Sequence, residues 1–217
     1  MKRPQQLTDL LLFLQRQKIN ISSEQSEKLA EYYKNLISYS HVHRIISKND
    51  TQFIVEKHFL SSFYFVKEIK NNIDRGDYIL DLGSGAGFPG IILSIFFENN
   101  HIVLIDSVRK KTLFLKKIVR DLNLNCEIIN DRIENYKDKS IYSFKFITAR
   151  AVAGFDELYS LAYPFLQNAE LHSIKGEDFE KEIRTTAAYN YSFYKIDTVW
   201  QNYSEYLKDK VYLKIRL

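Results

Sequence analysis

The sequence is poor in cysteine, proline and glycine. Its single cysteine, Cys126, excludes an internal disulfide, which favours a reducing compartment. With three prolines and seven glycines among 217 residues, collagen-like repeats and long flexible linkers are excluded as well.

Long apolar runs are also missing. The longest stretch without charge, residues 82–97, contains four glycines and Pro89, whereas a membrane-spanning helix needs about 20 mostly apolar residues. The apolar run at 10–14, which follows Lys2 and Arg3, is shorter than the apolar region of a signal peptide, roughly 7 to 15 residues. These observations predict a cytoplasmic protein with no membrane contact.

The composition is that of a folded protein. Hydrophobic residues make up 45% of the chain and charged residues 27%, which excludes a disordered chain. At this length we expect one domain, with a short appendage at most, that buries roughly 70% of its unfolded surface. The net charge of +4 allows an anionic partner such as nucleic acid but does not require one.

The pattern of hydrophobic residues changes once along the chain. Residues 1–70 show helical spacing of leucine and tyrosine, with Ser22 and Ser23 as candidate caps. From Tyr78 onward, short apolar runs alternate with amphipathic stretches, a pattern typical of a parallel sheet. We therefore predict an α/β fold with a doubly wound sheet in residues 71–217 and an N-terminal helical extension, residues 1–70, packed on it.

The expected elements can be given by their ranges. Strands are expected at 78–82, 102–105, 127–129, 144–148 and 171–174, a third N-terminal helix at about 53–69, and later helices near Pro89, Val108, Gly154 and Asp178. Residues 191–200 and 205–217 are expected to form an antiparallel pair that closes one edge of the sheet, with no helix after about Tyr189.

Four of the seven glycines lie within residues 83–90, directly after the first expected strand. Glycine permits a positive φ and lets a ligand approach the backbone, and the N-terminus of the following helix offers free N–H groups. The pattern predicts a nucleotide-type site. A Walker P-loop is excluded because no Gly-Lys-Ser/Thr follows, but residues 85–90 also fit the dinucleotide pattern G-x-G-x-x-G, so a nicotinamide cofactor stays open.

Two carboxylates favour S-adenosylmethionine. Asp81 precedes the first glycine, where an acid suits an ammonium or sulfonium group and would repel a pyrophosphate. Asp106 ends the next strand, 25 residues later, where it can accept hydrogen bonds from two ribose hydroxyls of either cofactor. The structural alternative is that both acids merely cap loops.

At these residues the chain resembles the bacterial 16S rRNA guanine-N7 methyltransferases, also called the glucose-inhibited division protein B family, which have the class I methyltransferase fold. The matching segments, in order, are 81–91, 104–107, 110–111 with 114–115, 131–134, 149–151 and 174–176. The resemblance covers essentially the whole chain. It implies a Rossmann-like, doubly wound, mostly parallel sheet of seven strands.

The resemblance and the glycine loop together give a set of candidate cofactor-binding residues. They are Asp81, Gly83, Gly85, Gly87, Phe88, Asp106, Ile133, Glu134 and Arg150. The resemblance implies that Ile133 and Glu134 flank the adenine, and an apolar residue beside an acceptor suits its face and amino group. Ile133 is equally interpretable as a core residue that starts a helix.

The resemblance also implies that Arg150 lies at the active site, and it is our candidate catalytic residue. Arg150 and Lys175, each at a strand end, can contact phosphate or guanine O6, or can form structural ion pairs. Arg109 and Lys110 begin a helix, 108–122, with a basic polar side, which suits RNA binding or is simply solvated.

The implied reaction is direct transfer of a methyl group to guanine N7 of 16S rRNA, free or within the small ribosomal subunit. N7 of neutral guanine carries no proton, so no general base is needed, and we expect catalysis from alignment and desolvation. The place after the fourth strand reads Thr-Ala-Arg-Ala rather than the Asn/Asp-Pro-Pro-aromatic motif typical of amine methylation. Cys126 is interpreted as a small buried residue, and neither a metal site nor a protein partner is indicated.

The N-terminal region departs from the family pattern. Residues 44–46 read Arg-Ile-Ile, and Ser61 stands where the family has aspartate, although His58 is kept. Substrate contacts there are therefore open. Three alternatives remain besides the leading one: a small-molecule methyltransferase, a noncatalytic RNA-binding assembly factor on the same fold, and a nicotinamide-dependent oxidoreductase.

Overall fold

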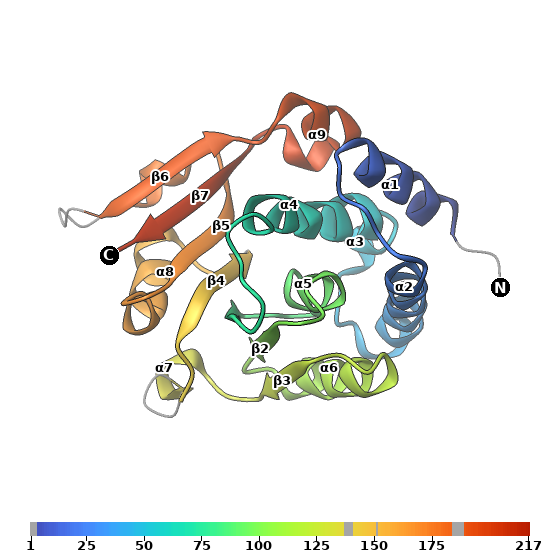
Figure 1. Ribbon diagram of the computed structural model, residues 1–217, viewed down its shortest axis with the longest axis horizontal. Coiled ribbons are helices and arrows are strands. Elements are labelled where there is room, and N and C mark those ends of the chain that lie inside the picture. The colour runs from blue at the N-terminus through green and yellow to red at the C-terminus, as the bar shows by residue number, and fades with distance from the viewer. Residues whose placement is uncertain (1–3, 137–140, 151, 184–188) are drawn as a thin grey trace.

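One sheet of seven strands organises the protein in the computed structural model, which describes residues 4–136, 141–150, 152–183 and 189–217 (Figure 1). The strands lie in the order β3-β2-β1-β4-β5-β7-β6. β1 to β5 are parallel, and β7 is antiparallel to both of its neighbours. Their bounds are β1 Tyr78–Leu82, β2 His101–Ile105, β3 Cys126–Ile129, β4 Phe144–Arg150, β5 Glu170–Gly176, β6 Asn190–Lys195 and β7 Lys210–Arg216. The predicted fold class is confirmed.

Helices cover both faces of this sheet (Figure 1). The longer ones are α1 Gln5–Arg16, α2 Ser23–His43, α4 Leu60–Ile69, α5 Gly90–Phe96, α6 Arg109–Asp121 and α8 Phe155–Ala162. Shorter ones are α3 Lys48–Thr51, the π-helix η1 Ile54–Phe59, α7 Ile133–Tyr136, α9 Thr198–Tyr203, and the 3₁₀ turns η2 Tyr163–Phe165, η3 Phe179–Glu182 and η4 Glu205–Leu207.

Strand residues divide their side chains between the two faces with a period of two. In β2, Ile102 and Leu104 join the apolar cluster that contains residues of α5 and α6, whereas Val103 and Ile105 join the cluster that contains residues of α8. The sheet is therefore buried on both faces, which is why its strands are apolar runs rather than alternating ones.

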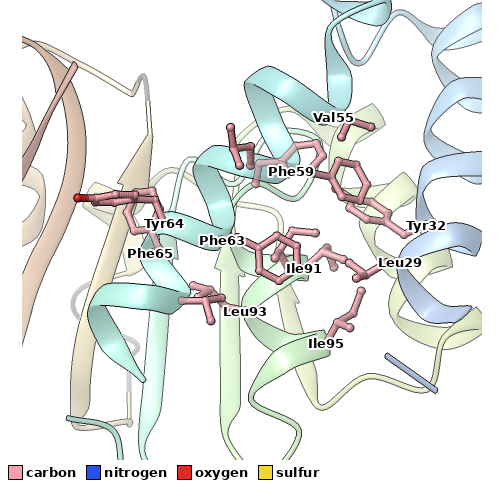
Figure 2. Close-up of a cluster of buried hydrophobic side chains, with 14 of the residues drawn as sticks. Leu29, Tyr32, Val55, Phe59, Phe63, Tyr64, Phe65, Ile91, Leu93 and Ile95 are labelled. Carbon is pink, nitrogen blue, oxygen red and sulfur yellow. The ribbon is translucent and has the colours of Figure 1, made fainter. Parts of the chain in front are cut away.

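The N-terminal helices share the first of these clusters. α2 begins with a capping box between Ser22 and Gln25, and its buried Leu29 and Tyr32 meet α4 and α5 (Figure 2). The same figure shows Phe63 of α4 beside the isoleucines of α5. Because these helices and one face of the sheet form a single cluster, the domain boundary at residue 70 stays a prediction.

The structure corrects two sequence expectations at the C-terminal edge. The strand expected through Trp200 ends at Lys195, and Thr198–Tyr203 form helix α9 instead. The reason is tertiary: Trp200 is fully buried and packs edge-on against Phe13 of α1, with ring centroids 5.1 Å apart. The sequence around Trp200 could not predict this contact, because α1 lies near the other end of the chain.

Two helices also differ from expectation. Near Asp178 the described residues form only the 3₁₀ turn η3, because Phe179 is its single buried residue and no apolar stripe continues it. The helix expected at about 53–69 is present, but it consists of two parts: the π-helix η1, Ile54–Phe59, and the α-helix α4, Leu60–Ile69. In η1 the backbone widens before α4 begins at Leu60.

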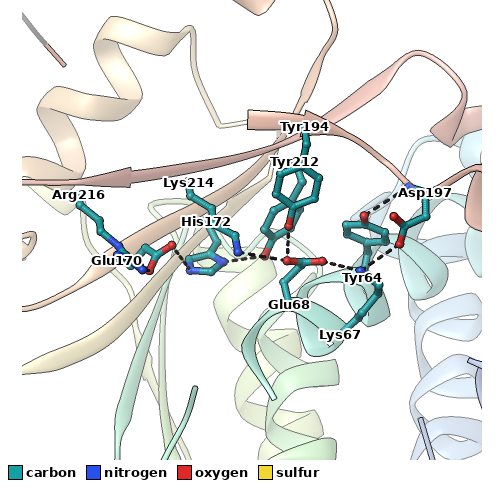
Figure 3. Close-up of polar contacts among 10 residues, drawn as sticks. All are labelled: Tyr64, Lys67, Glu68, Glu170, His172, Tyr194, Asp197, Tyr212, Lys214 and Arg216. Carbon is teal, nitrogen blue, oxygen red and sulfur yellow. Dashed lines mark hydrogen bonds and ion pairs between the residues drawn. The ribbon is translucent and has the colours of Figure 1, made fainter. Parts of the chain in front are cut away.

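A polar network joins α4 to the antiparallel edge of the sheet (Figure 3). The carboxylate of Glu68 accepts a hydrogen bond from Tyr194 and pairs with Lys67 at 2.7 Å and with Lys214 at 3.2 Å. Beside it, the buried His172 contacts the Tyr212 hydroxyl at 2.8 Å. Three elements thus depend on one carboxylate.

No helix within the described ranges is both long enough and apolar enough to cross a membrane.

The Glu68 carboxylate should therefore matter for stability. We expect Glu68→Ala to lower the free energy of unfolding by about 2 to 4 kcal/mol, because the Tyr194 hydroxyl and the Lys214 ammonium lose their acceptor and Lys67 keeps only Asp197. Urea denaturation, with the slope unchanged, measures this loss. The matched control is Glu24→Ala, which removes the exposed partner of Lys28 while Glu98 still pairs with it, and it should change stability by about 0.5 kcal/mol or less. Equal losses in both variants would contradict the assignment.

Candidate cofactor and substrate site

A cleft lies at the carboxyl ends of β1, β2 and β3, beside the place where the chain connections of β1 and β4 diverge. β1 leads into α5 on one face of the sheet and β4 leads into α8 on the other, which makes this the topological switch point. The cleft has a volume of about 160 Å³. Of the predicted cofactor residues, it brings together Gly83, Asp106, Ile133 and Glu134.

The glycine loop forms one wall of this cleft. Gly83 and Gly85 have φ of +63° and +60°, values that favour glycine. A Cβ on Gly83 would lie 2.8 Å from a methyl carbon of Val152, which lines the same cleft, whereas a Cβ on Gly85 would meet nothing closer than 3.8 Å. Gly83 therefore needs to be glycine for both its conformation and its space.

Asp106 connects the loop to the end of β2. Its carboxylate accepts hydrogen bonds from the N–H of Gly85 at 2.9 Å and of Val108 at 2.8 Å, and Lys111 lies 3.7 Å away. A carboxylate has about four lone-pair sites, so acceptor capacity remains on the side that faces the cleft. The side chain can both fix the loop and accept from a ligand hydroxyl.

Asp81 points into the protein interior, as the interpretation of this residue as a cap requires. Its side chain is fully buried, with one carboxylate oxygen accepting the N–H of Gly90 at 3.1 Å and the other accepting the hydroxyl of Thr148 at 2.9 Å. It is not among the residues that line the cleft. Burial raises the pKa of Asp81 to about 6, against the hydrogen bonds that favour its ionised form. The geometry is that of a cap on the start of α5, and Thr148 is a partner that sequence reasoning missed.

Gly87 and Phe88 also lie away from the cleft. A Cβ on Gly87 would come within 2.8 Å of the Tyr32 hydroxyl, and that hydroxyl donates to the carbonyl of Ala86 at 2.7 Å. Phe88 is buried and packs on Phe59 of η1. This half of the loop faces the N-terminal helices, so its sequence serves packing on them.

Ile133 and Glu134 begin α7 after β3. Ile133 lines the cleft and also packs against the second apolar cluster, so its adenine contact stays a prediction. Glu134 is exposed beside it.

The chemistry of the cleft residues matches the adenosine part of S-adenosylmethionine. Asp106 offers acceptor capacity at a strand end for ribose hydroxyls, Ile133 offers an apolar surface for an adenine face, and Gly83 lets the backbone approach closely. The cleft residues therefore fit the adenosine part of the cofactor.

Arg150 lies at the end of β4 but turns toward η1. Its Nη1 donates to the carbonyl of Lys57 at 3.3 Å, and its Nη2 lies 2.6 Å from Nδ1 of His58. The rings of His58 and Phe88 stack with centroids 5.2 Å apart, and the guanidinium carbon lies 5.5 Å from the Phe88 centroid. Sequence reasoning noted His58 but not this pairing, because the π-helical turn that places it has no local signal.

The predicted RNA contacts separate into two kinds. The ammonium of Lys175 donates to the carbonyl of Ala153 and pairs with Glu182 at 3.1 Å. These contacts favour the interpretation of Lys175 as a structural ion pair rather than an RNA contact. Arg109 and Lys110 are exposed at the start of α6, and neither forms a salt bridge with any residue of the described ranges. They follow Ser107, which lines the cleft.

Cys126 is partly buried in β3, and burial raises the pKa of its thiol to about 12. The thiol is therefore protonated at neutral pH and is no nucleophile, in agreement with the interpretation of Cys126 as a small packing residue. Within the described ranges, no group of three histidine, cysteine or acidic side chains could hold a metal ion.

Comparison with known proteins assigns the family. Residues 25–205 match the family described as rRNA small subunit methyltransferase G. The chain belongs to this family. The predicted resemblance and the prediction of a methyltransferase are confirmed.

Individual relatives agree with this assignment. The chain is 37% identical over 178 residues to the ribosomal RNA small subunit methyltransferase G of Mycoplasma capricolum, covering 80% of this chain and 74% of the relative. It is 36% identical over 167 residues to the enzyme of that name from Mesoplasma florum, covering 76% and 69%. A solved S-adenosylmethionine-dependent methyltransferase from Aquifex aeolicus shares the fold, with a TM-score of 0.52 at 19% identity, covering 79% of this chain and 95% of that one.

The two glycines with nearly equal φ give a matched test of the cleft. We expect Gly83→Ala and Gly85→Ala each to lose about 1 to 2 kcal/mol of stability from backbone strain, because an L-residue resists a positive φ. Gly83→Ala should in addition weaken S-adenosylmethionine binding by tenfold or more, because its Cβ displaces Val152 in the cleft wall. Calorimetric titration measures the difference. Equal affinities in the two variants would place the cofactor elsewhere.

Proposed function

We propose that this protein transfers the methyl group of S-adenosylmethionine to N7 of a guanine in small-subunit ribosomal RNA. The observation that carries the proposal is the cleft at the switch point, lined by Gly83, Asp106 and Ile133, in a chain of the rRNA small subunit methyltransferase G family. Relatives that bear that name cover most of this chain. The cofactor and the nucleic-acid substrate both follow from this family membership.

In this proposal Asp106 binds the ribose hydroxyls of the cofactor and Ile133 contacts the adenine. When bound, S-adenosylmethionine supplies an electrophilic methyl group on a sulfonium. Guanine N7 has an exposed lone pair and no proton, so the protein needs to orient the base and exclude water rather than remove a proton. Arg150, behind the glycine loop at the end of β4, is the candidate for contact with the guanine O6 or a phosphate.

The start of α6 is the proposed RNA-binding surface. Arg109 and Lys110 are exposed and directly follow the cleft residue Ser107, so they stand beside the place where the target base must enter. Their charges are not neutralised by carboxylates of the described residues. Phosphate binding is the use that fits such a surface.

The assay that tests the function is transfer of labelled methyl to small-subunit particles and to stripped rRNA, followed by mapping of the modified base. We expect N7-methylguanine at one site in the wild type. Asp106→Ala should weaken S-adenosylmethionine binding by about 10- to 100-fold, because the ribose loses its acceptor and the glycine loop loses its anchor. Asp178→Ala, at an exposed aspartate, is the matched control and should bind normally. Label found only in a small molecule, or in no product at all, would refute the proposal.

The proposed RNA surface predicts a change in salt dependence. We expect Arg109→Ala with Lys110→Ala to weaken RNA binding and to reduce the slope of log affinity against log salt by about 2, because two phosphate contacts are lost. Filter binding between 50 and 200 mM salt, about a fourfold range, measures the slope. Lys175→Met, which removes an ammonium already paired with Glu182, should leave the slope unchanged. A reduced slope in Lys175→Met, with an unchanged slope in the Arg109→Ala, Lys110→Ala variant, would contradict this proposal and indicate that RNA binds at β5.

A further inference from the structure

Two consecutive residues of one π-helical turn hold the guanidinium of Arg150, and the side chain of Tyr206 also contacts it. Lys57 accepts through its backbone carbonyl and His58 through its ring, at 3.3 and 2.6 Å. Both residues lie in η1, which belongs to the N-terminal helices rather than to the sheet that carries Arg150. π-helical turns are rare and occur frequently at functional sites.

The His58 imidazole must accept in this contact. An arginine side chain has only donors and stays protonated, so Nδ1 of His58 offers its lone pair and the ring proton resides on Nε2. The surroundings keep the ring neutral, because burial and the nearby Arg150 charge lower the pKa of His58 to about 3. The histidine therefore orients the guanidinium without neutralising it.

The charge on Arg150 has no direct carboxylate partner. Within the part of the chain that the structure describes, no acidic oxygen lies within salt-bridge distance of it. The nearby carboxylate of Asp81 is bonded to Gly90 and Thr148. One turn beyond His58, the hydroxyl of Ser61 donates to the carbonyls of Lys57 and His58 and adds no negative charge.

Two donors in this cluster are buried without a partner. Nε of Arg150 and Nε2 of His58 lack a hydrogen-bond acceptor among the described residues. A buried cation that is held only by neutral acceptors retains a strong attraction for an anion or a polarised oxygen, and unsatisfied buried donors favour the arrival of an acceptor. Phosphate oxygens and guanine O6 are the acceptors that an RNA substrate brings.

We propose that His58 is a positioning residue, whose neutral imidazole holds Arg150 against Phe88 so that the guanidinium charge stays without a carboxylate partner in the protein and can attract the RNA substrate. This inference rests on the proposed function, since it names how one residue of that site is kept in place. It also gives η1 a role in the reaction: the N-terminal helices orient a side chain that the sheet supplies.

The test compares His58→Leu, which removes the acceptor, with His58→Asn, whose amide oxygen can replace Nδ1. We expect His58→Leu to lower kcat/KM for small-subunit rRNA by about 10- to 100-fold, with the Kd for S-adenosylmethionine unchanged. His58→Asn should recover most of that loss. In an Arg150→Ala background, His58→Leu should cost no more than about twofold further, because a residue that acts through Arg150 has nothing left to position.

A second measurement follows the side chain itself. The Nε–H of Arg150 should exchange slowly with solvent in the wild type and in His58→Asn, and rapidly in His58→Leu, as observed by NMR of ¹⁵N-labelled protein. Unchanged exchange in His58→Leu, a His58→Asn variant as impaired as His58→Leu, or fully additive effects with Arg150→Ala would each overturn the inference. A wild type that methylates no RNA would instead refute the proposed function, and the exchange experiment would still decide whether His58 positions Arg150.

Discussion

The site depends on the hydrogen bonds that the buried carboxylate of Asp81 accepts. This carboxylate accepts the first N–H of α5 at Gly90 and the hydroxyl of Thr148, and so joins β1, α5 and β4 at the point where the chain diverges to the two faces of the sheet. Burial raises the pKa of Asp81 to about 6, which leaves it ionised at neutral pH. A negative charge at the start of a helix is favourable there.

The glycine loop above Asp81 has two faces with different partners. In its first part, Gly83 lines the cleft and the N–H of Gly85 is bonded to Asp106. Its second part, at Gly87 and Phe88, packs against Tyr32 and η1. The N-terminal helices are therefore coupled to the loop through direct contacts, and they hold Arg150 at the same time. Cofactor and substrate sides of the proposed site meet at this one loop.

Sequence reasoning succeeded where the signal is local. The strand at 78–82 and its glycine loop were predicted at the bounds observed, because an apolar run followed by alternating glycines has few other structures open to it. It failed at Trp200, which lies in a helix that packs on Phe13, a residue distant along the chain. It also did not find Thr148 as a partner of Asp81, because the two residues lie in different strands.

By itself, the sequence determined the first five strands in chain order, the doubly wound sheet, the family and the location of the glycine loop, since hydrophobic period, glycine content and motif spacing are properties of neighbouring residues. Only the tertiary structure decided the direction of Arg150, the acceptor role of His58 and the division of the candidate residues between a cleft and a packed interface. The physical reason is that a side chain's direction depends on the hydrogen-bond partners and space that other elements bring to it, and these come together only when the chain has folded.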